Sequence, residues 1–163
     1  MKITAIEVYQ VDLPLREGRY NWSGGNFMEV FDSTVVAVET DEGITGLGEA
    51  YWGVGVAELV HRAAPLIVGE NPFNIGKLVV LMIRCLSGEG STGGATVTAI
   101  SGIEIALWDL MGRALNTPIY NLFGGKYRDK IRVYADCHAG ATSDPRSYGE
   151  RGKAVADAGF TAI

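Results

Sequence analysis

The residues of this sequence with the clearest potential for ligand contact are aromatic. Tyr20 and Trp22 lie in a segment, residues 14–32, that contains three glycines and shows no sustained helix or strand pattern. Segments of this length without regular structure are usually binding loops, lids or disordered chain, and their aromatic side chains argue against disorder. We therefore predict that residues 14–32 form a binding loop or lid. Tyr20 and Trp22 would then contact a ligand or, alternatively, pack against the rest of the fold.

Arrangements typical of a nucleophile or a metal site are not indicated. Cys137 and His138 are adjacent, but neighbouring residues of a strand point to opposite faces of a sheet, which disfavours a catalytic pair. Glu104 and Asp109 are five residues apart, a spacing that does not bring two carboxylates to one face of a helix. Because no carboxylate cluster has the spacing of a Ca²⁺ or Mg²⁺ site, we expect no metal ligand in this chain.

The composition is that of a soluble globular protein, with 47% hydrophobic and 20% charged residues. The net charge of -5 disfavours nucleic acid and anionic membrane surfaces as partners. The N-terminus alternates charged and apolar residues, unlike a signal peptide, and glycine and serine interrupt the long uncharged runs, so no membrane span is expected. Cys85 and Cys137 are too few for a disulfide framework, and we expect two reduced, buried thiols and a cytoplasmic location.

The elements that must position these residues come in two sets, of which the first ends near Gly125. Alternating apolar residues predict three strands of an antiparallel sheet, at 2–13, 33–40 and 44–51. Apolar residues at helical spacing predict three helices, at 54–68, 72–86 and from Ala99 to Thr117. The third helix is apolar on nearly all sides and should therefore be central. Gly46 and Gly48 inside a strand predict the close approach of another backbone.

The pattern changes after Gly125. A strand is predicted at 130–136, a helix opened by Asp144-Pro145 runs to about Ala158, and another strand begins at 161–163. Strand, helix and strand form the unit of parallel α/β architecture, in which strands are buried on both faces. Because one such unit cannot close a sheet, we expect the chain to be truncated.

These segments, in this order, resemble the enolase superfamily, specifically the mandelate racemase and muconate lactonizing enzyme group. The resemblance is carried by TDEGITGLGE from Thr40, GENP from Gly69, ALWDLMG from Ala106, and the pair Gly124-Gly125. It extends over essentially the whole chain. It implies an α+β capping domain over residues 1–125, made of a three-stranded antiparallel meander and a helical bundle. Residues 126–163 would be the truncated start of a (β/α)8 TIM-like barrel, namely its first β/α unit and the start of its second strand.

The resemblance implies an enzyme that removes a proton α to a carboxylate, with Mg²⁺ stabilising the enediolate and a Lys or His as base. In the family these groups lie on later barrel strands, so this chain alone is expected to have no catalytic residue and no metal ligand, and to be inactive. The expected reaction of the parent protein is dehydration of a sugar acid or hydroxy acid. One alternative is a racemase, epimerase or dehydratase acting on a proline-type amino acid derivative, and another is a non-catalytic cap or assembly module.

The resemblance also implies which aromatic residues face the substrate, a small carboxylic acid. In the family, the loop that corresponds to the one with Tyr20 and Trp22 covers the barrel mouth. Tyr51 and Trp52 sit where a second capping loop begins. These four side chains are therefore predicted substrate contacts, although each could instead pack within the cap.

His138 is the fifth predicted substrate contact. Together with Asp136 it follows the first predicted barrel strand, at the end where barrel enzymes keep their active sites. The alternative is that both are ordinary polar residues of a loop. Because full-length family members commonly assemble through the cap, the full-length protein is expected to be a homo-oligomer.

Overall fold

The structure is a computed structural model that describes residues 1–16, 18–22, 25–51, 53, 55–86, 88, 93–136 and 144–163. Contacts between residues divide the chain into two compact units. Unit 1 contains Met1–Asp12 and Asp32–Gly125, and unit 2 contains Leu13–Phe31 and Lys126–Ile163. The segment predicted as a loop or lid therefore belongs, by its contacts, with the residues that follow Gly125.

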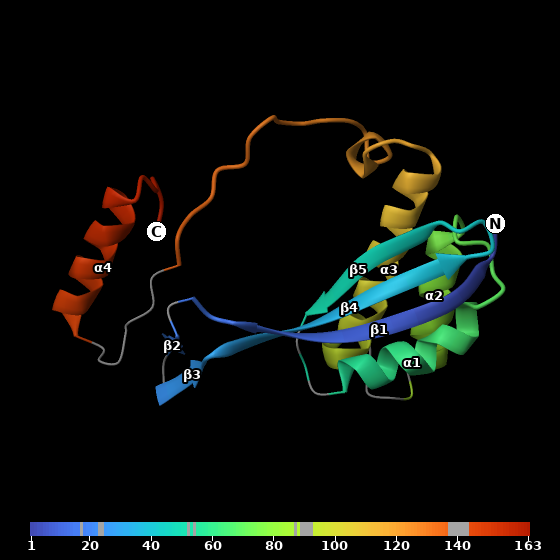
Figure 1. Ribbon diagram of the computed structural model, residues 1–163, viewed down its shortest axis with the longest axis horizontal. Helices are drawn as coiled ribbons and strands as arrows, with labels where there is room; N and C mark the ends of the chain where they lie inside the picture. Colours follow the sequence, from blue (N-terminus) through green and yellow to red (C-terminus); the bar gives the residue numbers. More distant parts are fainter. Residues whose placement is uncertain are drawn as a thin grey trace. The chain divides into compact units, whose positions relative to one another are not determined.

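A three-stranded antiparallel sheet forms one layer of unit 1 (Figure 1). Its order is β1 (Ile3–Pro14), β4 (Val30–Thr40) and β5 (Thr45–Tyr51). The register of β4 and β5 places Ala37 opposite Leu47, and Gly43 in the turn between the strands has a φ of 75°. The predicted strands and hairpin are confirmed, although β4 begins three residues before the predicted start at Ser33.

Three helices pack on one face of this sheet and enclose the core (Figure 1). They are α1 (Val56–Ile67), α2 (Ile75–Leu86) and α3 (Gly94–Ala114), and a short 3-10 turn, η3 (Ile119–Asn121), follows. α3 contacts β5, α1 and α2, so its predicted central position is confirmed, although it begins at Gly94 rather than near Ala99. The expectation of a buried thiol is wrong for Cys85, which is exposed near the end of α2.

Glycine lets α3 lie directly against β5. A Cβ atom added to Gly48 would be 2.0 Å from the carbonyl oxygen of Gly102, and one added to Gly46 would be 2.1 Å from that of Ala106. No side chain fits at either position without moving one of the two backbones, so the predicted close approach is confirmed.

Among the described residues, α3 is the one helix that is long and apolar enough to cross a membrane by length and composition. Nine of its residues are buried, and its contacts are with the sheet and the other helices of unit 1. A helix at the centre of a globular core is apolar for the same reason as a membrane helix, because it meets little water. The contacts of α3 therefore account for its composition.

Unit 2 contains a ribbon that the sequence reading missed. β2 (Tyr20–Trp22) and β3 (Asn26–Met28) pair antiparallel, with Asn21 opposite Phe27, so the prediction of a segment without regular structure is wrong here. Each strand has only three residues, too few for an alternation pattern to be detected.

The second part of unit 2 contains α4 (Pro145–Asp157), which begins as predicted. Asp144 caps it, since its carboxylate accepts a hydrogen bond from the amide of Arg146 at 3.2 Å. The strands predicted at 130–136 and 161–163 form no regular ladder. The amide of Ala135 donates to the carbonyl of Ala162 at 3.1 Å, but a parallel ladder needs several such bonds and neighbouring strands.

Candidate functional site

A polar pocket of about 490 Å³ lies in unit 1 where β1 ends and β4 begins. Its lining residues, most of them polar, are Gln10, Asp12, Asp32, Ser33, Thr34, Gly53 and Gly55. The amide nitrogen of Gln10 donates to the Thr34 hydroxyl at 3.4 Å, which links the two strands across the pocket. Carboxylate, amide and hydroxyl groups of this kind can hydrogen-bond the hydroxyl or amino groups of a small polar molecule.

Tyr51 ends β5, the strand that pairs with the strand carrying Ser33 and Thr34 of this pocket. It is directly opposite Ser33 in the sheet, and its side chain is 57% exposed. Ser33 is itself buried, and its hydroxyl donates to Glu49 at 2.7 Å. Tyr51 is not one of the residues that line the pocket, and its contact with substrate stays a prediction.

The β2–β3 ribbon of unit 2 positions Tyr20 and Trp22. Residues two apart on a strand point to the same face, and the two ring centroids are 6.3 Å apart. The Tyr20 hydroxyl donates a hydrogen bond to the carboxylate of Asp136, 116 residues later in the sequence. Trp22 is 41% exposed, so its ring is available for contact.

Arg19, which immediately precedes β2, contacts two residues on the other side of the same ribbon. Its guanidinium lies 3.9 Å above the ring of Phe27 and bonds the carboxylate of Glu29 at 2.8 Å. The amide of Leu15 also donates to the carbonyl of Glu29, at 2.9 Å. These cation–π and charge-assisted contacts hold the ribbon in addition to its cross-strand pairs, Tyr20 with Met28, Asn21 with Phe27 and Trp22 with Asn26.

The carboxylate of Asp136 raises the pKa of the Tyr20 phenol above its ordinary value. The hydrogen bond from the neutral phenol is the main cause, and desolvation and the negative charge of Asp136 act in the same direction. Tyr20 therefore stays protonated, as the hydrogen-bond donor, throughout the neutral pH range.

The structure brings some predicted residues together and leaves others unplaced. Tyr20 and Asp136 meet, and Trp22 lies beside Tyr20. Trp52 and His138 lie outside the described residues.

The sequence reading missed the pocket residues Gln10, Asp12 and Asp32. Polar residues two apart near the end of a strand, as at Gln10 and Asp12, are a signal that could have found these two residues.

The described residues do not make up a magnesium site. Mg²⁺ prefers several oxygen ligands in octahedral geometry, including carboxylates. In the described part of the chain, no three His, Cys, Asp or Glu side chains gather. Asp12 and Asp32 both line the polar pocket, and among the residues that the structure describes no third His, Cys, Asp or Glu groups with them.

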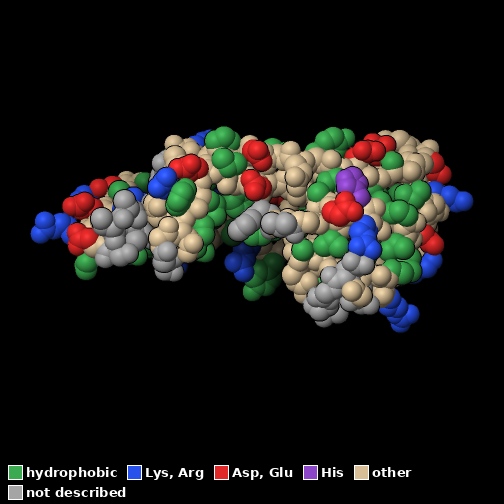
Figure 2. All heavy atoms as spheres, turned by 90° about the horizontal axis from the view of Figure 1, so that it is seen from below, with side chains coloured by type: hydrophobic (Ala, Val, Ile, Leu, Met, Phe, Trp, Pro, Cys, Tyr) green, Lys and Arg blue, Asp and Glu red, His purple; other side chains and the backbone are tan. Residues whose placement is uncertain are grey.

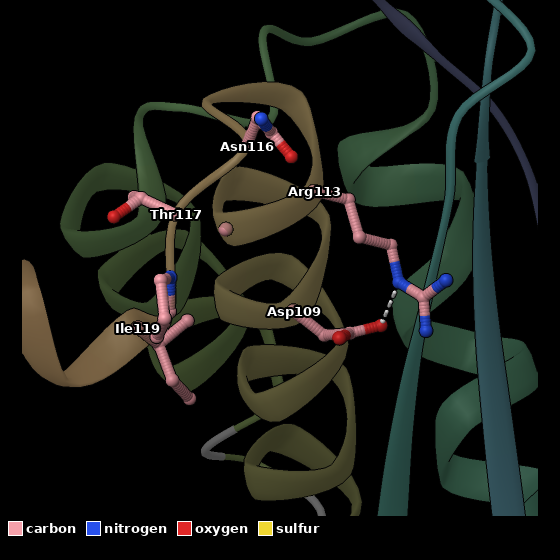
Figure 3. Close-up of a pocket in the computed structure, with 7 residues that line it drawn as sticks. Asp109, Arg113, Asn116, Thr117 and Ile119 are labelled. Carbon is pink, nitrogen blue, oxygen red and sulfur yellow. Dashed lines mark hydrogen bonds and ion pairs between the residues drawn. The ribbon is translucent and has the colours of Figure 1, made fainter.

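A second pocket, of about 330 Å³, lies at the carboxyl end of α3 (Figure 3). Asp109 accepts hydrogen bonds there from the Arg113 guanidinium at 2.7 Å and from the Leu47 amide at 2.8 Å. The wall opposite this pair includes Thr117, whose amide donates to the carbonyl of Gly112 at 2.9 Å. Because these contacts join α3 to β5 and close the end of the helix, we interpret this pocket as structural.

Comparison with known proteins identifies the family to which this fold belongs. A model of the mandelate racemase / muconate lactonizing enzyme N-terminal domain matches residues 28–124. The chain is 48% identical over 143 residues to a cis-3-hydroxy-L-proline dehydratase from Roseibium aggregatum, an alignment that covers 82% of this chain and 37% of that protein. It is 42% identical over 158 residues to a D-xylonate dehydratase from Haloferax volcanii, which covers 96% of this chain and 36% of that protein.

Solved structures agree with the sequence comparisons. The crystal structure of an N-succinyl Arg/Lys racemase from Bacillus cereus superposes with a TM-score of 0.84 at 31% identity, covering 98% of this chain and 42% of that one. The chain thus spans well under half the length of each of these three relatives. By the match over residues 28–124 and by its cap of sheet and helices, the chain belongs to the mandelate racemase / muconate lactonizing enzyme family, of which it contains the N-terminal domain.

Proposed function

We propose that this chain is the substrate-recognising cap, with the first β/α unit, of a dehydratase that acts on a sugar acid or another small hydroxy acid. The observation that carries the proposal is the similarity to two dehydratases, at 48% and 42% identity over most of the chain. Their substrates, a hydroxyproline and xylonate, are both small carboxylic acids with a hydroxyl group. The polar pocket of unit 1 offers hydrogen-bonding groups suited to such a molecule.

In this proposal the chain binds and orients the substrate but does not transfer its proton. Gln10, Ser33 and Thr34 of the polar pocket would hydrogen-bond substrate hydroxyls. We propose that the proton-abstracting base and the magnesium ligands of the complete enzyme lie outside these 163 residues.

Racemisation is the second candidate. The chain is 34% identical over 169 aligned positions to an N-succinyl-L-Arg/Lys racemase from Bacillus cereus, and the fold of that enzyme superposes on this one. Dehydration and racemisation both begin with removal of a proton next to a carboxylate, so a single cap can serve either reaction.

Activity assays of two proteins test these proposals. One is the 163-residue chain, and the other is the product of the complete reading frame that contains it. Each is incubated with cis-3-hydroxy-L-proline, D-xylonate and N-succinyl-L-lysine, with Mg²⁺ and with EDTA as the matched control. Loss of water in the complete protein, absent with EDTA and absent in the chain alone, supports the dehydratase.

The other outcomes are equally informative. Inversion of the α-carbon without loss of water supports the racemase. A folded complete protein that does neither contradicts both enzyme proposals and favours the non-catalytic module. Turnover by the 163-residue chain alone would contradict the proposal that the base and the magnesium ligands lie outside these residues.

We also propose a cytoplasmic, homo-oligomeric parent protein without a nucleic-acid partner. On the face shown in Figure 2, Lys and Arg side chains lie scattered among Asp and Glu side chains, in keeping with the net charge of -5. Sedimentation of the complete protein with and without DNA measures both its mass and its binding.

A further inference from the structure

The hydrogen bond between Tyr20 and Asp136 joins two stretches of chain that the sequence holds far apart. Tyr20 begins the β2–β3 ribbon, and Asp136 lies in segment 126–136, which has no regular secondary structure. Both belong to unit 2, although the ribbon interrupts the path between two neighbouring strands of the unit 1 sheet. The hydrogen bond from Tyr20 to Asp136 is one contact that joins the ribbon to this segment.

Tyr20 and Asp136 lie in two segments that are each stabilised by further contacts of their own. Arg19 stacks on Phe27 and bonds Glu29, which fixes the base of the ribbon. Ala135, next to Asp136, is bonded to Ala162.

Arg132 also links the segment that carries Asp136 to the residues that follow α4. Its guanidinium donates to the hydroxyl of Thr161 at 3.1 Å and to its carbonyl at 2.5 Å. The phenol and the carboxylate therefore meet from two separately supported segments, as the two parts of a latch do.

We propose that Tyr20 and Asp136 form a latch that holds the β2–β3 ribbon against the end of segment 126–136 and so fixes the position of Trp22. Asp136 is then a positioning residue, and the Tyr20 hydroxyl is engaged with Asp136 rather than with substrate. A phenol that donates to a carboxylate forms a charge-assisted bond, which is stronger than a neutral one. The latch stands apart from the proposed function, and only its use, to present Trp22 to a small hydroxy acid, rests on that function.

Hydrogen exchange in the 163-residue chain tests the latch without any assay of activity. Tyr20→Phe removes only the hydroxyl, and Asp136→Ala removes the acceptor. Each should raise amide exchange in residues 20–22 and 26–28 by about tenfold or more, the effect of losing one hydrogen bond to a charged group, and the double variant should add nothing further. Tyr127→Phe and Asp129→Ala are matched controls on the exposed chain before Asp136, and they should leave the ribbon unchanged.

Titration of the Tyr20 phenol distinguishes loss of the Tyr20–Asp136 bond in the variants from a general loss of structure. The difference in ultraviolet absorbance between the parent chain and Tyr20→Phe reports the ionisation of Tyr20. In Asp136→Ala, the pKa of this phenol should fall back toward its ordinary value, while Asp136→Glu should keep it raised.

Two results would overturn the proposal. One is unchanged ribbon exchange in both single variants, and the other is a double variant whose effect is the sum of the two. If Asp136→Ala unfolds unit 2, exchange in α4 rises as well, and Tyr20→Phe, which keeps the ring, then decides the question.

Discussion

The two units differ in how they hold their apolar side chains. In unit 1, Leu107 and Leu110 of α3 have no exposed surface and belong to a core that joins the sheet to three helices. In unit 2, Ile131 and Val133 are 78% and 65% exposed, and α4 has no buried residue. Each fully buried aliphatic side chain contributes about 1.5–3 kcal/mol to stability. Unit 1 is therefore stabilised mainly by its core, and unit 2 by individual polar contacts.

The largest effect should come from filling the space between β5 and α3. In Gly48→Ala, the new Cβ would meet the backbone of α3, which cannot yield as a side chain would, so we expect a loss of about 3 kcal/mol or more. Gly76→Ala is the control, because a Cβ there meets nothing within 4 Å and the change favours a helix by up to about 1 kcal/mol. Urea denaturation followed by circular dichroism measures both, and equal stability of the two variants would contradict the close packing.

A pair of truncations compares the two units directly. Leu107→Ala leaves a cavity in the core of unit 1 and should cost about 2–5 kcal/mol. Val133→Ala in unit 2 removes a side chain that is already mostly in water and should change stability by less than about 0.5 kcal/mol. A similar loss in both variants, measured by the same denaturation, would mean that Val133 is buried in solution.

The same contrast explains what the sequence could predict. In unit 1 the alternation and helical spacing of apolar residues reflect burial, so β1, β4, β5 and the helices were predicted near their observed bounds. Gly46 and Gly48 were interpretable because a glycine inside a strand implies a close neighbour.

In unit 2 most side chains are exposed, so no burial pattern marks its elements. β2 and β3 depend on three cross-strand pairs around Gly25, and residues 130–136 resemble a strand in sequence without having a ladder. Tyr20 was found as an aromatic residue of a loop, but its partner Asp136 is 116 residues away, a distance that no local pattern connects.

An intermediate effect is expected at Asp109, which accepts a hydrogen bond from the Leu47 amide of the edge strand β5. It also pairs with Arg113 of its own helix, as Figure 3 shows. Asp109→Ala removes the acceptor of the Leu47 amide and the partner of Arg113, and should cost about 1–2 kcal/mol. Arg113→Ala removes only the partly exposed ion pair and should cost less than about 1 kcal/mol. If both variants lose the same stability, the bond to the Leu47 amide contributes nothing.

The smallest effect is a dependence of unit 2 on alkaline pH. The folded pKa of Tyr20 is raised above 10.0, so the folded unit holds the phenol proton more tightly than the unfolded chain does. The stability from this group is therefore fully present below about pH 10 and is lost as pH rises through the raised pKa.

Unit 1 also contains a group with a raised pKa, the amino group of Met1, which serves as the comparison for Tyr20. Glu42 lies 2.7 Å from that group and raises its pKa above 8.0, so its contribution is lost at lower alkaline pH. Hydrogen exchange of the β2–β3 ribbon, followed as pH rises past 10 and corrected for the intrinsic rate, should increase in the parent chain more than in Tyr20→Phe. Because Tyr20→Phe leaves Met1 and Glu42 untouched, the loss in unit 1 should be identical in both proteins. An identical loss in the ribbon as well would show that the phenol of Tyr20 does not hold unit 2 together.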